Sequence, residues 1–387
     1  MRFKRIFLLV LDSLGVGEAI DADDYNDKGA STLGHLSSDT DLFIPNLKKM
    51  GLLNTLYMNN SEADAYYTIA RPKNKGKDCL TAHYELMGIA PTCGIDVFNY
   101  GPFPRPLLEK IASNLQKPII GNIVSDAKTA INKLYKRQME TKSLIIYTTG
   151  DANLEVAAEE NVVPLSELYE CCEKIRKITD QDGWRVSTVI ARPYIVKNNQ
   201  VIFTDDQKRF TLSPNNKSVL ESLKEAGYQT ISIGKVSDIF NGVGVSKTIK
   251  SASNIEGVNK LLDIMDKNFD GLCFANLSDF DTYFGHARDI NGYKQSLEEF
   301  DVQIPLILNK LNIDDLLIIT ADHGCDPKME RFNHTRENVP VIIYSRSMLE
   351  SGQLEILDTL GDIGATISDN FKVEKPWLGT SFLDKLK

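Results

Sequence analysis

Short runs of apolar residues, each about as long as a β-strand, recur along this chain and alternate with segments of helical periodicity. The clearest apolar runs are Ile6–Leu11, Leu144–Tyr147, Val186–Ala191, Thr230–Ile233, Leu272–Asn276, Leu316–Thr320 and Val341–Tyr344. Helix-like segments lie between several of these runs, at Val163–Thr179, Asn216–Ala226, Val258–Lys267 and Gly292–Leu311. Continuous apolar runs are typical of strands buried on both faces, and strand–helix alternation is typical of parallel sheets. The sequence therefore predicts an α/β fold in which helices flank a largely parallel sheet.

The length of the chain and a change in its composition predict two domains. A chain of 387 residues can form two domains, or one α/β domain with an insertion. Residues 94–212 are richer in Pro and have strand–helix–strand signals of their own, as an inserted domain would. We predict a core domain formed by residues 1–93 and 213–387, and an inserted α/β cap domain formed by residues 94–212.

The overall charge and the cysteine pattern exclude several classes of protein. A net charge of −9 and the lack of a basic stripe argue against a nucleic-acid-binding protein. No apolar stretch approaches the length of a membrane span, and the apolar run after the basic start stops at Asp12, too early for a signal peptide. The six cysteines form no C-x-x-C pair, so we expect reduced thiols in the cytoplasm. We expect a small-molecule substrate and a monomer, although no sequence feature sets the oligomeric state.

The histidines of the chain are concentrated in three short clusters near its C-terminal end. Only five histidines occur, and three of them lie in the clusters at residues 281–286, 321–327 and 333–337, the first two of which also contain aspartates. Imidazole and carboxylate groups together are the donors that borderline-hard divalent metals prefer. Two carboxylates and three imidazoles are too many for one tetrahedral site. The clusters therefore predict a two-metal centre whose remaining ligands come from elsewhere in the chain.

Acidic residues also follow the predicted strands. Asp12, Asp281 and Asp322 each come within a few residues of the end of an apolar run. In open α/β sheets, functional sites gather outside the carboxyl ends of the strands. Each aspartate by itself could equally be an ordinary turn or capping residue. Their repetition at several strand ends favours a metal site at one edge of the sheet.

The segment from residue 77 to residue 85 contains a candidate nucleophile, Cys79. A thiol beside two metal ions can be deprotonated by them and can attack phosphorus or sulfur. The simpler alternative is a buried structural cysteine, which is the usual case for an isolated Cys. His83, in the same segment, is more typical of a supporting residue than of a metal ligand.

Together these motifs resemble phosphopentomutase of the bacterial type, in the alkaline phosphatase superfamily. The resemblance covers nearly the whole chain. The matching segments are residues 5–13, 32–35, 190–193, 233–238, 279–281, 320–324, 334–337, 362–366 and 379–383. The resemblance implies an alkaline-phosphatase-like core and a cap domain for substrate recognition. It also implies interconversion of ribose 1-phosphate and ribose 5-phosphate, and of their 2-deoxy analogues, through a phosphorylated enzyme that a sugar bisphosphate primes.

The resemblance further implies a site for two manganese ions and a set of substrate-binding residues. One ion would be held by Asp12, Asp322 and His323, and the other by Asp281, His286 and His334, with the nucleophile position bridging the two. In the cap, Thr149, Asp151 and Arg192 would face the sugar, and Lys235 would do so from the core.

Two departures from the family pattern bear on the reaction. The family nucleophile is a threonine, and Cys79 stands at that position, while Thr81 aligns with a second hydroxyl that is not the nucleophile. Because a thiolate is a softer ligand than an alkoxide, Cys79 favours zinc over manganese. The C-x-P-x-R signature of sulfatases is absent after Cys79, so conversion to formylglycine is unsupported. In the cap, an Asn-Arg-His-Asp-Tyr run of the family is replaced here by residues 206–210, where Lys208 or Arg209 could bind a phosphate.

We therefore keep several hypotheses about function. The leading one is a metal-dependent phosphomutase that acts on a pentose phosphate. A second is a related phosphomutase or phosphotransferase for another sugar, which the altered cap sequence favours. A third is a hydrolase of phosphate or phosphonate esters, in which water intercepts a cysteine-linked intermediate. The fourth is a metal-binding regulatory or scaffold protein that lost catalysis with its threonine, although idle buried carboxylates are costly to keep.

Overall fold

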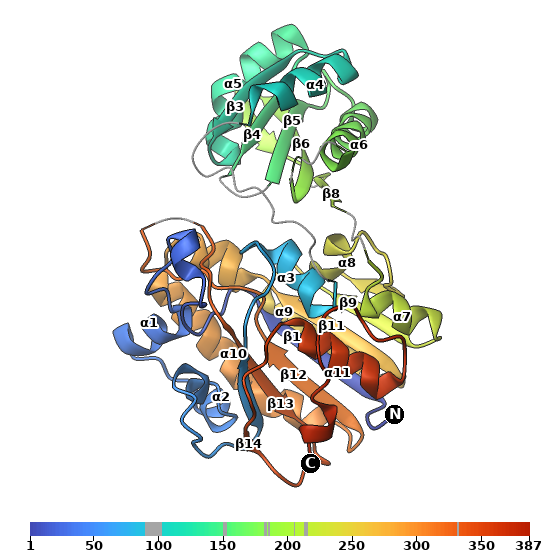
Figure 1. The fold of residues 1–387 in the computed structure, drawn as a ribbon. Helices are drawn as coiled ribbons and strands as arrows, with labels where there is room; N and C mark the ends of the chain where they lie inside the picture. Colours follow the sequence, from blue (N-terminus) through green and yellow to red (C-terminus); the bar gives the residue numbers. More distant parts are fainter. Residues whose placement is uncertain are drawn as a thin grey trace. The chain divides into compact units, whose positions relative to one another are not determined.

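The computed structural model describes residues 1–89, 103–149, 153–181, 184, 186–204, 206–212, 216–330 and 333–387. The chain divides into two compact units, one formed by residues 1–92 and 214–387 and the other by residues 93–213. We call the first the core unit and the second the inserted unit. Each unit contains a β-sheet of its own with helices on both faces (Figure 1).

The sheet of the core unit is mixed but largely parallel. Its strands, in spatial order, are β10 (Lys247–Ile249), β9 (Gln229–Ile233), β11 (Gly271–Leu277), β1 (Arg5–Leu11), β12 (Asp315–Thr320), β13 (Val339–Tyr344), β2 (Tyr66–Ala70) and β14 (Gly352–Gln353). The neighbouring pairs are parallel from β10 to β12, and only β13 is antiparallel to both of its neighbours. The central strands β1, β11 and β12 are buried along their whole length, which explains their continuous apolar sequence.

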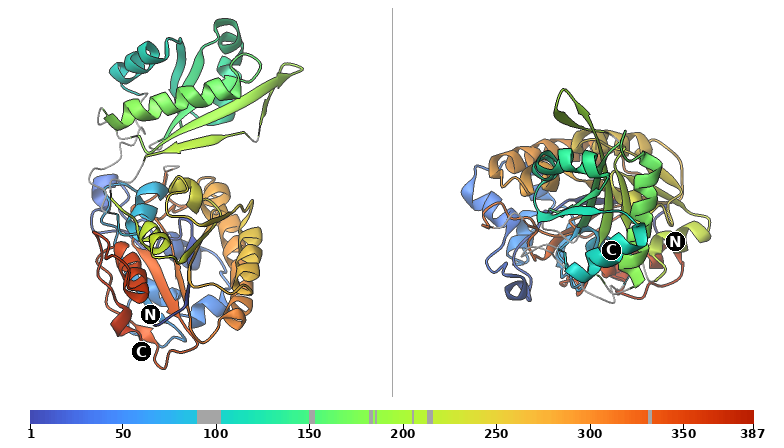
Figure 2. Two further views of the ribbon diagram at one scale, coloured as in Figure 1. Left: turned by 90° about the vertical axis from the view of Figure 1, so that its right-hand side faces the viewer. Right: turned by 90° about the horizontal axis from the view of Figure 1, so that it is seen from above.

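The helices of the core unit cover both faces of this sheet. They are η1 (Ala22–Tyr25), α1 (Thr32–Asp39), α2 (Pro45–Lys49), η2 (Leu53–Leu56), α3 (Cys79–Leu86), α7 (Val219–Glu225), α8 (Val236–Ile239), α9 (Asn254–Met265), η3 (Phe280–Gly285), α10 (Ile290–Lys310), α11 (Gly361–Phe371) and η4 (Leu383–Lys385). Helices α9 and α10 lie on one face and α11 lies on the other (Figure 2). Because the parallel strands all end at the same edge, the loops that follow them meet there.

The inserted unit is a second, smaller α/β structure. Its strands are β3 (Ile119–Val124), β4 (Leu144–Thr148), β5 (Asn153–Glu159), β6 (Thr188–Lys197), β7 (Gln200–Phe203) and β8 (Lys208–Thr211), with β8 paired to β6. Its helices are α4 (Arg105–Leu115), α5 (Ala127–Thr141) and α6 (Leu165–Gln181). One apolar cluster packs α4 and α6 against the sheet, and a second cluster packs α5 against the opposite face. The unit therefore has a core of its own on each side of its sheet.

The fold class predicted from the sequence is confirmed: the chain is an α/β protein with a largely parallel sheet flanked by helices. Each predicted apolar run lies in or overlaps a strand, and each predicted helical segment overlaps α6, α7, α9 or α10. The pattern missed the antiparallel pairing of β13, because apolar content does not encode strand direction. Within the described residues, no helix combines the length and the apolar character needed to cross a membrane.

Candidate metal centre

Side chains from segments far apart in the sequence meet at the carboxyl edge of the core sheet and form two groups of possible metal ligands. Set A consists of Asp12, Cys79, Asp322 and His323, and set B consists of Asp281, His286 and His334. Within each set, one donor atom per residue lies within 4.8 Å of all the others. The ring of His323 in set A stacks on the ring of His334 in set B with their centroids 3.9 Å apart, so the two sets adjoin.

The order of the strands explains why the carboxylates of the two sets converge. Asp12 directly follows β1, and Asp322 comes two residues after the end of β12. Asp281 lies in η3, a π-helix that follows β11. Because β1 is flanked by β11 and β12 and is parallel to both, the three carboxylates emerge side by side. A π-helical turn at such a place is common at functional sites.

Hydrogen bonds with the backbone orient the ligands of set A. One oxygen of Asp322, Oδ1, accepts the backbone N–H groups of Ser13 and His323, each at 3.1 Å. The Nδ1 atom of His323 donates to the carbonyl of Gly324 at 3.1 Å. These bonds leave Oδ2 of Asp322 and Nε2 of His323, which lie 3.4 Å apart. Each residue thus presents one remaining donor atom to the site.

The backbone beside Asp12 adopts an unusual conformation. Ser13 has a φ of +70°, in the left-handed region that costs free energy for any residue except glycine. Its N–H donates to Asp322 and its carbonyl accepts the N–H of Cys325, which holds it in place. The hydroxyl of Tyr293 lies 3.2 Å from the Ser13 hydroxyl and donates to the carbonyl of Asp12 at 3.3 Å. These contacts fix the turn that presents the Asp12 carboxylate.

The donor atoms of set B converge in the same way. The Nδ1 atom of His334 donates to the carbonyl of Lys77 at 2.9 Å, which turns Nε2 toward the site. That Nε2 lies 3.1 Å from Nε2 of His286. Oδ2 of Asp281 lies 3.3 Å from Nε2 of His286 and 3.4 Å from Nε2 of His334. Two imidazole nitrogens and one carboxylate oxygen thus point at a common centre.

Several buried polar atoms of the centre have no hydrogen-bond partner within the protein. They are Oδ1 of Asp12, Oδ1 of Asp281, Oδ2 of Asp322 and Nε2 of His323. Leaving carboxylate oxygens buried and unpaired is costly, and a cation offsets that cost. Imidazole, carboxylate and thiol donors are those that divalent transition metals bind. The two sets therefore fit a two-metal centre, and they contain every ligand that the sequence predicted.

Lys235, predicted to contact the substrate, follows β9 at the same edge of the sheet. Its ammonium group contacts Oδ2 of Asp12, and 29% of its side chain is exposed. Burial lowers the pKa of Lys235, but its acidic neighbours Asp12 and Cys79 outweigh this effect and hold the pKa well above its usual value. A permanent positive charge thus lies against set A and is partly open to solvent.

Cys79 is the first residue of α3, and its surroundings position its sulfur. Asp78 caps the helix by accepting the backbone N–H of Thr81 at 3.0 Å. One turn later, Nδ1 of His83 donates to the carbonyl of Cys79 at 2.8 Å and lies 3.3 Å from the sulfur. The other ring nitrogen of His83 accepts from the amide of Asn276 at 3.2 Å. Burial raises the pKa of the Cys79 thiol well above its usual value, so the thiolate needs a bound cation.

Without bound metal, the carboxylates of set A do not share the same protonation state. Burial, together with the charge of Asp322, raises the pKa of Asp12 to about 8, although Lys235 opposes the shift. Burial also disfavours ionised Asp322, but its neighbours His323 and His83 outweigh this effect and hold its pKa below the usual value. Burial lowers the pKa of both histidines to about 4. Asp12 therefore keeps a proton at neutral pH until a metal displaces it.

These pKa shifts predict how the stability of the metal-free protein depends on pH. Between pH 6.5 and 8 the unfolded chain has ionised Asp12, whereas the folded chain keeps it protonated, and buried Glu337, with a pKa near 7, acts in the same direction. Since the folded state binds more protons, its stability falls as the pH rises, by about 1.5 kcal/mol per pH unit for the two groups together. The histidines have lowered pKa values and oppose this trend only below about pH 6.5. Thermal melts in EDTA at several pH values should show this fall in stability. The dependence of stability on pH should be weaker in Asp12→Asn, and an equal dependence in that variant would contradict the raised pKa of Asp12.

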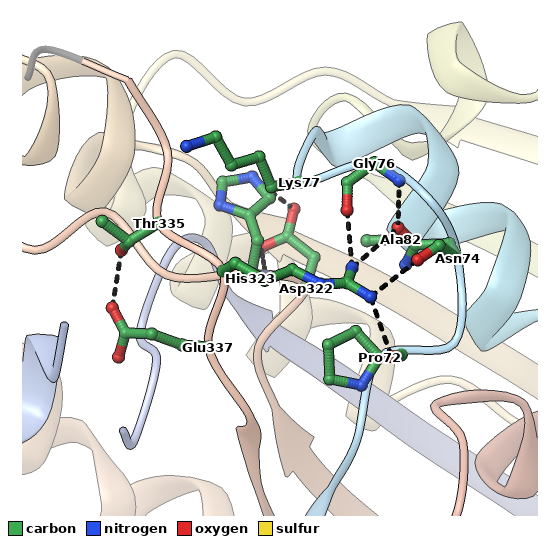
Figure 3. Close-up of a pocket in the computed structure, with 10 residues that line it drawn as sticks. Pro72, Asn74, Gly76, Lys77, Ala82, Asp322, His323, Thr335 and Glu337 are labelled. Atoms are coloured by element: carbon green, nitrogen blue, oxygen red, sulfur yellow. Dashed lines mark hydrogen bonds and ion pairs between the residues drawn. The ribbon is translucent and has the colours of Figure 1, made fainter. Parts of the chain in front are cut away.

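Arg336 was part of a sequence motif, but its role was not predicted. Its guanidinium group is buried and donates to the carbonyls of Pro72 at 3.0 Å, Asn74 at 2.7 Å and Gly76 at 2.6 Å. It also forms two hydrogen bonds with Asp21, each at 2.9 Å. The loop held in this way leads directly into α3 and Cys79 (Figure 3). Arg336 thus joins the segment of His334 to the segment of the candidate nucleophile.

Glu337 is a second buried charge that the sequence did not assign. One carboxylate oxygen accepts the hydroxyl of Thr32 at 2.7 Å. The same oxygen accepts the hydroxyl of Thr335 at 2.6 Å (Figure 3). The other accepts the backbone N–H groups of Thr32 at 2.8 Å and Gly17 at 3.2 Å. Burial raises the pKa of this carboxyl to about 7. An adjacent Arg–Glu pair two residues after a ligand histidine was the signal that could have revealed both residues.

The predicted substrate residues of the inserted unit lie on or near its sheet. Thr149 is exposed at the end of β4, and Asp151 lies outside the described residues. The guanidinium group of Arg192 is bound by Glu155, with bonds of 3.0 and 3.1 Å, and by Gln207. Arg192 is therefore neutralised by a carboxylate that is itself buried.

Lys208 and Arg209 are consecutive residues of β8 and point to opposite faces of the sheet. In the pairing of β8 with β6, Arg209 lies opposite Ile190, which is on the same face as Arg192. Lys208 lies on the other face, with its ammonium group 4.9 Å from the ring centre of Phe210. Only Arg209 can therefore share a binding surface with Arg192.

Comparisons with known proteins agree with this fold. Among solved structures, the PH0037 protein from Pyrococcus horikoshii is 15% identical with a TM-score of 0.50, over 96% of this chain and 98% of that one. Phosphoglycerate mutase from Leishmania mexicana, crystallised at low cobalt concentration, is 11% identical with a TM-score of 0.50, over 98% of this chain and 97% of that one. These likenesses are of fold alone. A family model described as the metalloenzyme superfamily matches residues 4–375, and the chain therefore belongs to that superfamily.

Proposed function

We propose that this protein is a metal-dependent phosphomutase that interconverts (deoxy)ribose 1-phosphate and (deoxy)ribose 5-phosphate through a phosphoryl group carried on Cys79. The observation that carries the proposal is the position of Cys79, at the start of α3, with its sulfur grouped with the donors of set A. Set B adjoins set A through the stacked rings of His323 and His334. Among the described residues, the sulfur of Cys79 is grouped with the donors of set A and not with those of set B.

The bound ions, Mn²⁺ or in part Zn²⁺, would supply positive charge that neutralises the transferring phosphoryl group and stabilises both the attacking and the leaving atom. Residues of the chain position the sulfur and bind the phosphate. The bond from His83 to the Cys79 carbonyl fixes the first turn of α3 and with it the sulfur. Lys235 adds a cation that can bind a phosphate oxygen beside Asp12. In each transfer a sulfur–phosphorus bond forms as a sugar oxygen–phosphorus bond breaks, or the reverse.

The sugar bisphosphate has a defined role in this scheme. It leaves one phosphoryl group on Cys79 and departs as a monophosphate, which primes the enzyme. The primed enzyme then phosphorylates the free position of an incoming monophosphate and removes the phosphoryl group from the other position. Exclusion of water is required, because water would release the phosphoryl group as inorganic phosphate.

The direct test is an assay of ribose 1-phosphate with Mn²⁺, with and without a catalytic amount of ribose 1,5-bisphosphate. The proposal predicts ribose 5-phosphate as product and a dependence on the bisphosphate. Release of inorganic phosphate without bisphosphate would instead identify a hydrolase. Turnover of a hexose phosphate but not of a pentose phosphate would identify a related mutase with another sugar. Binding of metal without turnover of any sugar phosphate would identify a non-catalytic protein.

The contact between Glu155 and Arg192 yields a prediction about substrate binding. If Arg192 binds the sugar phosphate, Glu155 competes with the substrate for it. Glu155→Gln should then lower the KM for the pentose phosphate by roughly tenfold, because a neutral amide holds the guanidinium group less strongly. Steady-state kinetics check this, and an unchanged KM would remove Arg192 from the list of phosphate ligands.

The matched variant Arg192→Ala separates binding from stability. It should raise KM, and it should also destabilise the inserted unit by about 2 kcal/mol, because it leaves Glu155 buried without its partner. The double variant Glu155→Gln with Arg192→Ala should recover the stability but not the KM. Chemical denaturation of each variant measures the first effect independently of activity.

A further inference from the structure

The two ligand sets differ in the chemistry of their donor atoms. Set A contains a thiol, two carboxylates and one imidazole, so it offers three anionic donors when Cys79 is ionised. Set B contains one carboxylate and two imidazoles, so it offers a single anionic donor. Thiolate is a soft ligand that prefers zinc and cobalt to manganese, whereas carboxylate also suits manganese. Sulfur is present in one set only, so the two sets should differ in the metal that they prefer.

The two sets also differ in how completely the protein supplies their donors. The four donors of set A match the number that a tetrahedral site requires. Asp12, Asp322 and His323 are all buried, and backbone hydrogen bonds leave Asp322 and His323 with one donor atom each. Such a closed, pre-oriented set is typical of tightly held ions.

Set B is more open. It has three protein donors, which leaves at least one position of a tetrahedral ion for another ligand. One of the three, His286, has 33% of its side chain exposed, whereas the side chain of His323 in set A is only 4% exposed. An open set with an exposed imidazole exchanges its ion more readily and can accept an oxygen of a substrate.

We propose that the centre is asymmetric: set A, through the Cys79 thiolate, holds a thiophilic ion such as Zn²⁺ tightly, and set B holds a harder, exchangeable ion such as Mn²⁺. The inference rests on the proposed two-metal centre but not on the identity of the sugar. It assigns to Cys79 the role of a resident metal ligand that sets metal preference, in addition to its place as the nucleophile.

Titration of the metal-free full-length protein with Co²⁺ tests this inference without any substrate. Cobalt bound by a thiolate gives a sulfur-to-metal charge-transfer absorption in the near ultraviolet, and tetrahedral cobalt absorbs strongly in the visible range. The first equivalent of Co²⁺ should produce the charge-transfer band, and the second should add nothing to it. Zn²⁺ added afterwards should bleach this band before it displaces the second cobalt ion, whereas a large excess of Mn²⁺, which binds such donors more weakly than Co²⁺, should displace only the second.

Matched variants identify the sulfur. Cys79→Thr and Cys79→Ser should lose the charge-transfer band, and the affinity of the tighter site for Zn²⁺ should fall by about 100-fold or more. Cys325→Ser alters a cysteine that is buried near the centre but belongs to neither set, and it should keep the band. Circular dichroism of each variant shows that the fold is intact, and the two Cys79 variants check each other.

Other outcomes would overturn the inference. They are no charge-transfer band at any cobalt concentration, a band that grows with the second equivalent, or a band that survives in both Cys79 variants. The result is independent of the mutase assay. A cobalt–thiolate band without mutase activity would leave the asymmetric centre standing and remove the proposed reaction. Mutase activity without the band would support the proposed reaction and remove the asymmetric centre.

Discussion

Cys79→Ala is expected to lower mutase activity by about 1,000-fold or more, whereas Cys79→Thr should equal or exceed the wild-type rate with Mn²⁺. Alanine removes the only atom of this residue that can carry the phosphoryl group. Threonine restores a hydroxyl at the start of α3, where the same metal ions can deprotonate it, and a harder alkoxide suits Mn²⁺ better than a thiolate does. Initial rates of ribose 5-phosphate formation in Mn²⁺ and in Zn²⁺ measure both effects.

The comparison of metals makes the result of Cys79→Thr specific. The wild-type protein should gain relatively more from Zn²⁺, and the threonine variant relatively more from Mn²⁺, because the donor atom has changed from sulfur to oxygen. Cys325→Ala, at a buried cysteine outside both sets, should retain most of the activity and the metal content. If Cys79→Thr is as inactive as Cys79→Ala, Cys79 does not replace a hydroxyl nucleophile. Its thiol would then have a different function.

The main features of the fold and the centre follow from the sequence because they depend on local patterns. The continuous apolar runs at β1, β11 and β12 are typical of buried strands, and parallel strands place their following residues at one edge. Asp12, Asp281 and Asp322 lie there for that reason. The donor chemistry of three clustered histidines then predicted a metal site.

Features that depend on the pairing of distant residues could not be predicted. The contact between Glu155 and Arg192 joins residues on the neighbouring strands β5 and β6, and it depends on a register that one sequence does not encode. Likewise, Arg336 binds the carbonyls of a loop more than 250 residues earlier in the chain, since its bonds to Pro72 and Gly76 span 264 and 260 positions. Backbone carbonyls leave no signature in the sequence. A buried charge can therefore be noticed in a sequence, but its partner cannot be named.

The pairing of Cys79 with set A is a result of the same kind. The sequence places the cysteine in a segment about 200 residues before the three C-terminal histidine clusters. Only the fold shows that its sulfur lies with two carboxylates and an imidazole. The resemblance implied the two ligand sets and a nucleophile position that bridges them, and the fold adds that the sulfur is grouped with set A.

Asp281→Asn is expected to lower mutase activity by about 1,000-fold and to reduce the bound metal from two ions per chain to one. Asp281 is the only anionic donor of set B, and its Oδ2 lies within 3.4 Å of both ligand imidazoles. Burial disfavours the carboxylate, but the charges of His334 and His286 outweigh burial and hold the pKa of Asp281 well below its usual value. A neutral amide cannot balance a divalent ion in this set. Elemental analysis of the purified variant measures the metal, and initial rates measure the activity.

Asp279→Asn is the matched control, because Asp279 lies two residues earlier and belongs to neither set. Its carboxylate accepts the backbone N–H of Asn254 at 2.7 Å, and an amide oxygen can accept the same bond. Burial raises the pKa of Asp279, so a neutral side chain is not costly there. This variant should therefore keep two ions and most of the activity. Equal losses in both variants would show that the substitutions disturb η3 as a whole, whereas two bound ions and full activity in Asp281→Asn would show that set B holds no metal.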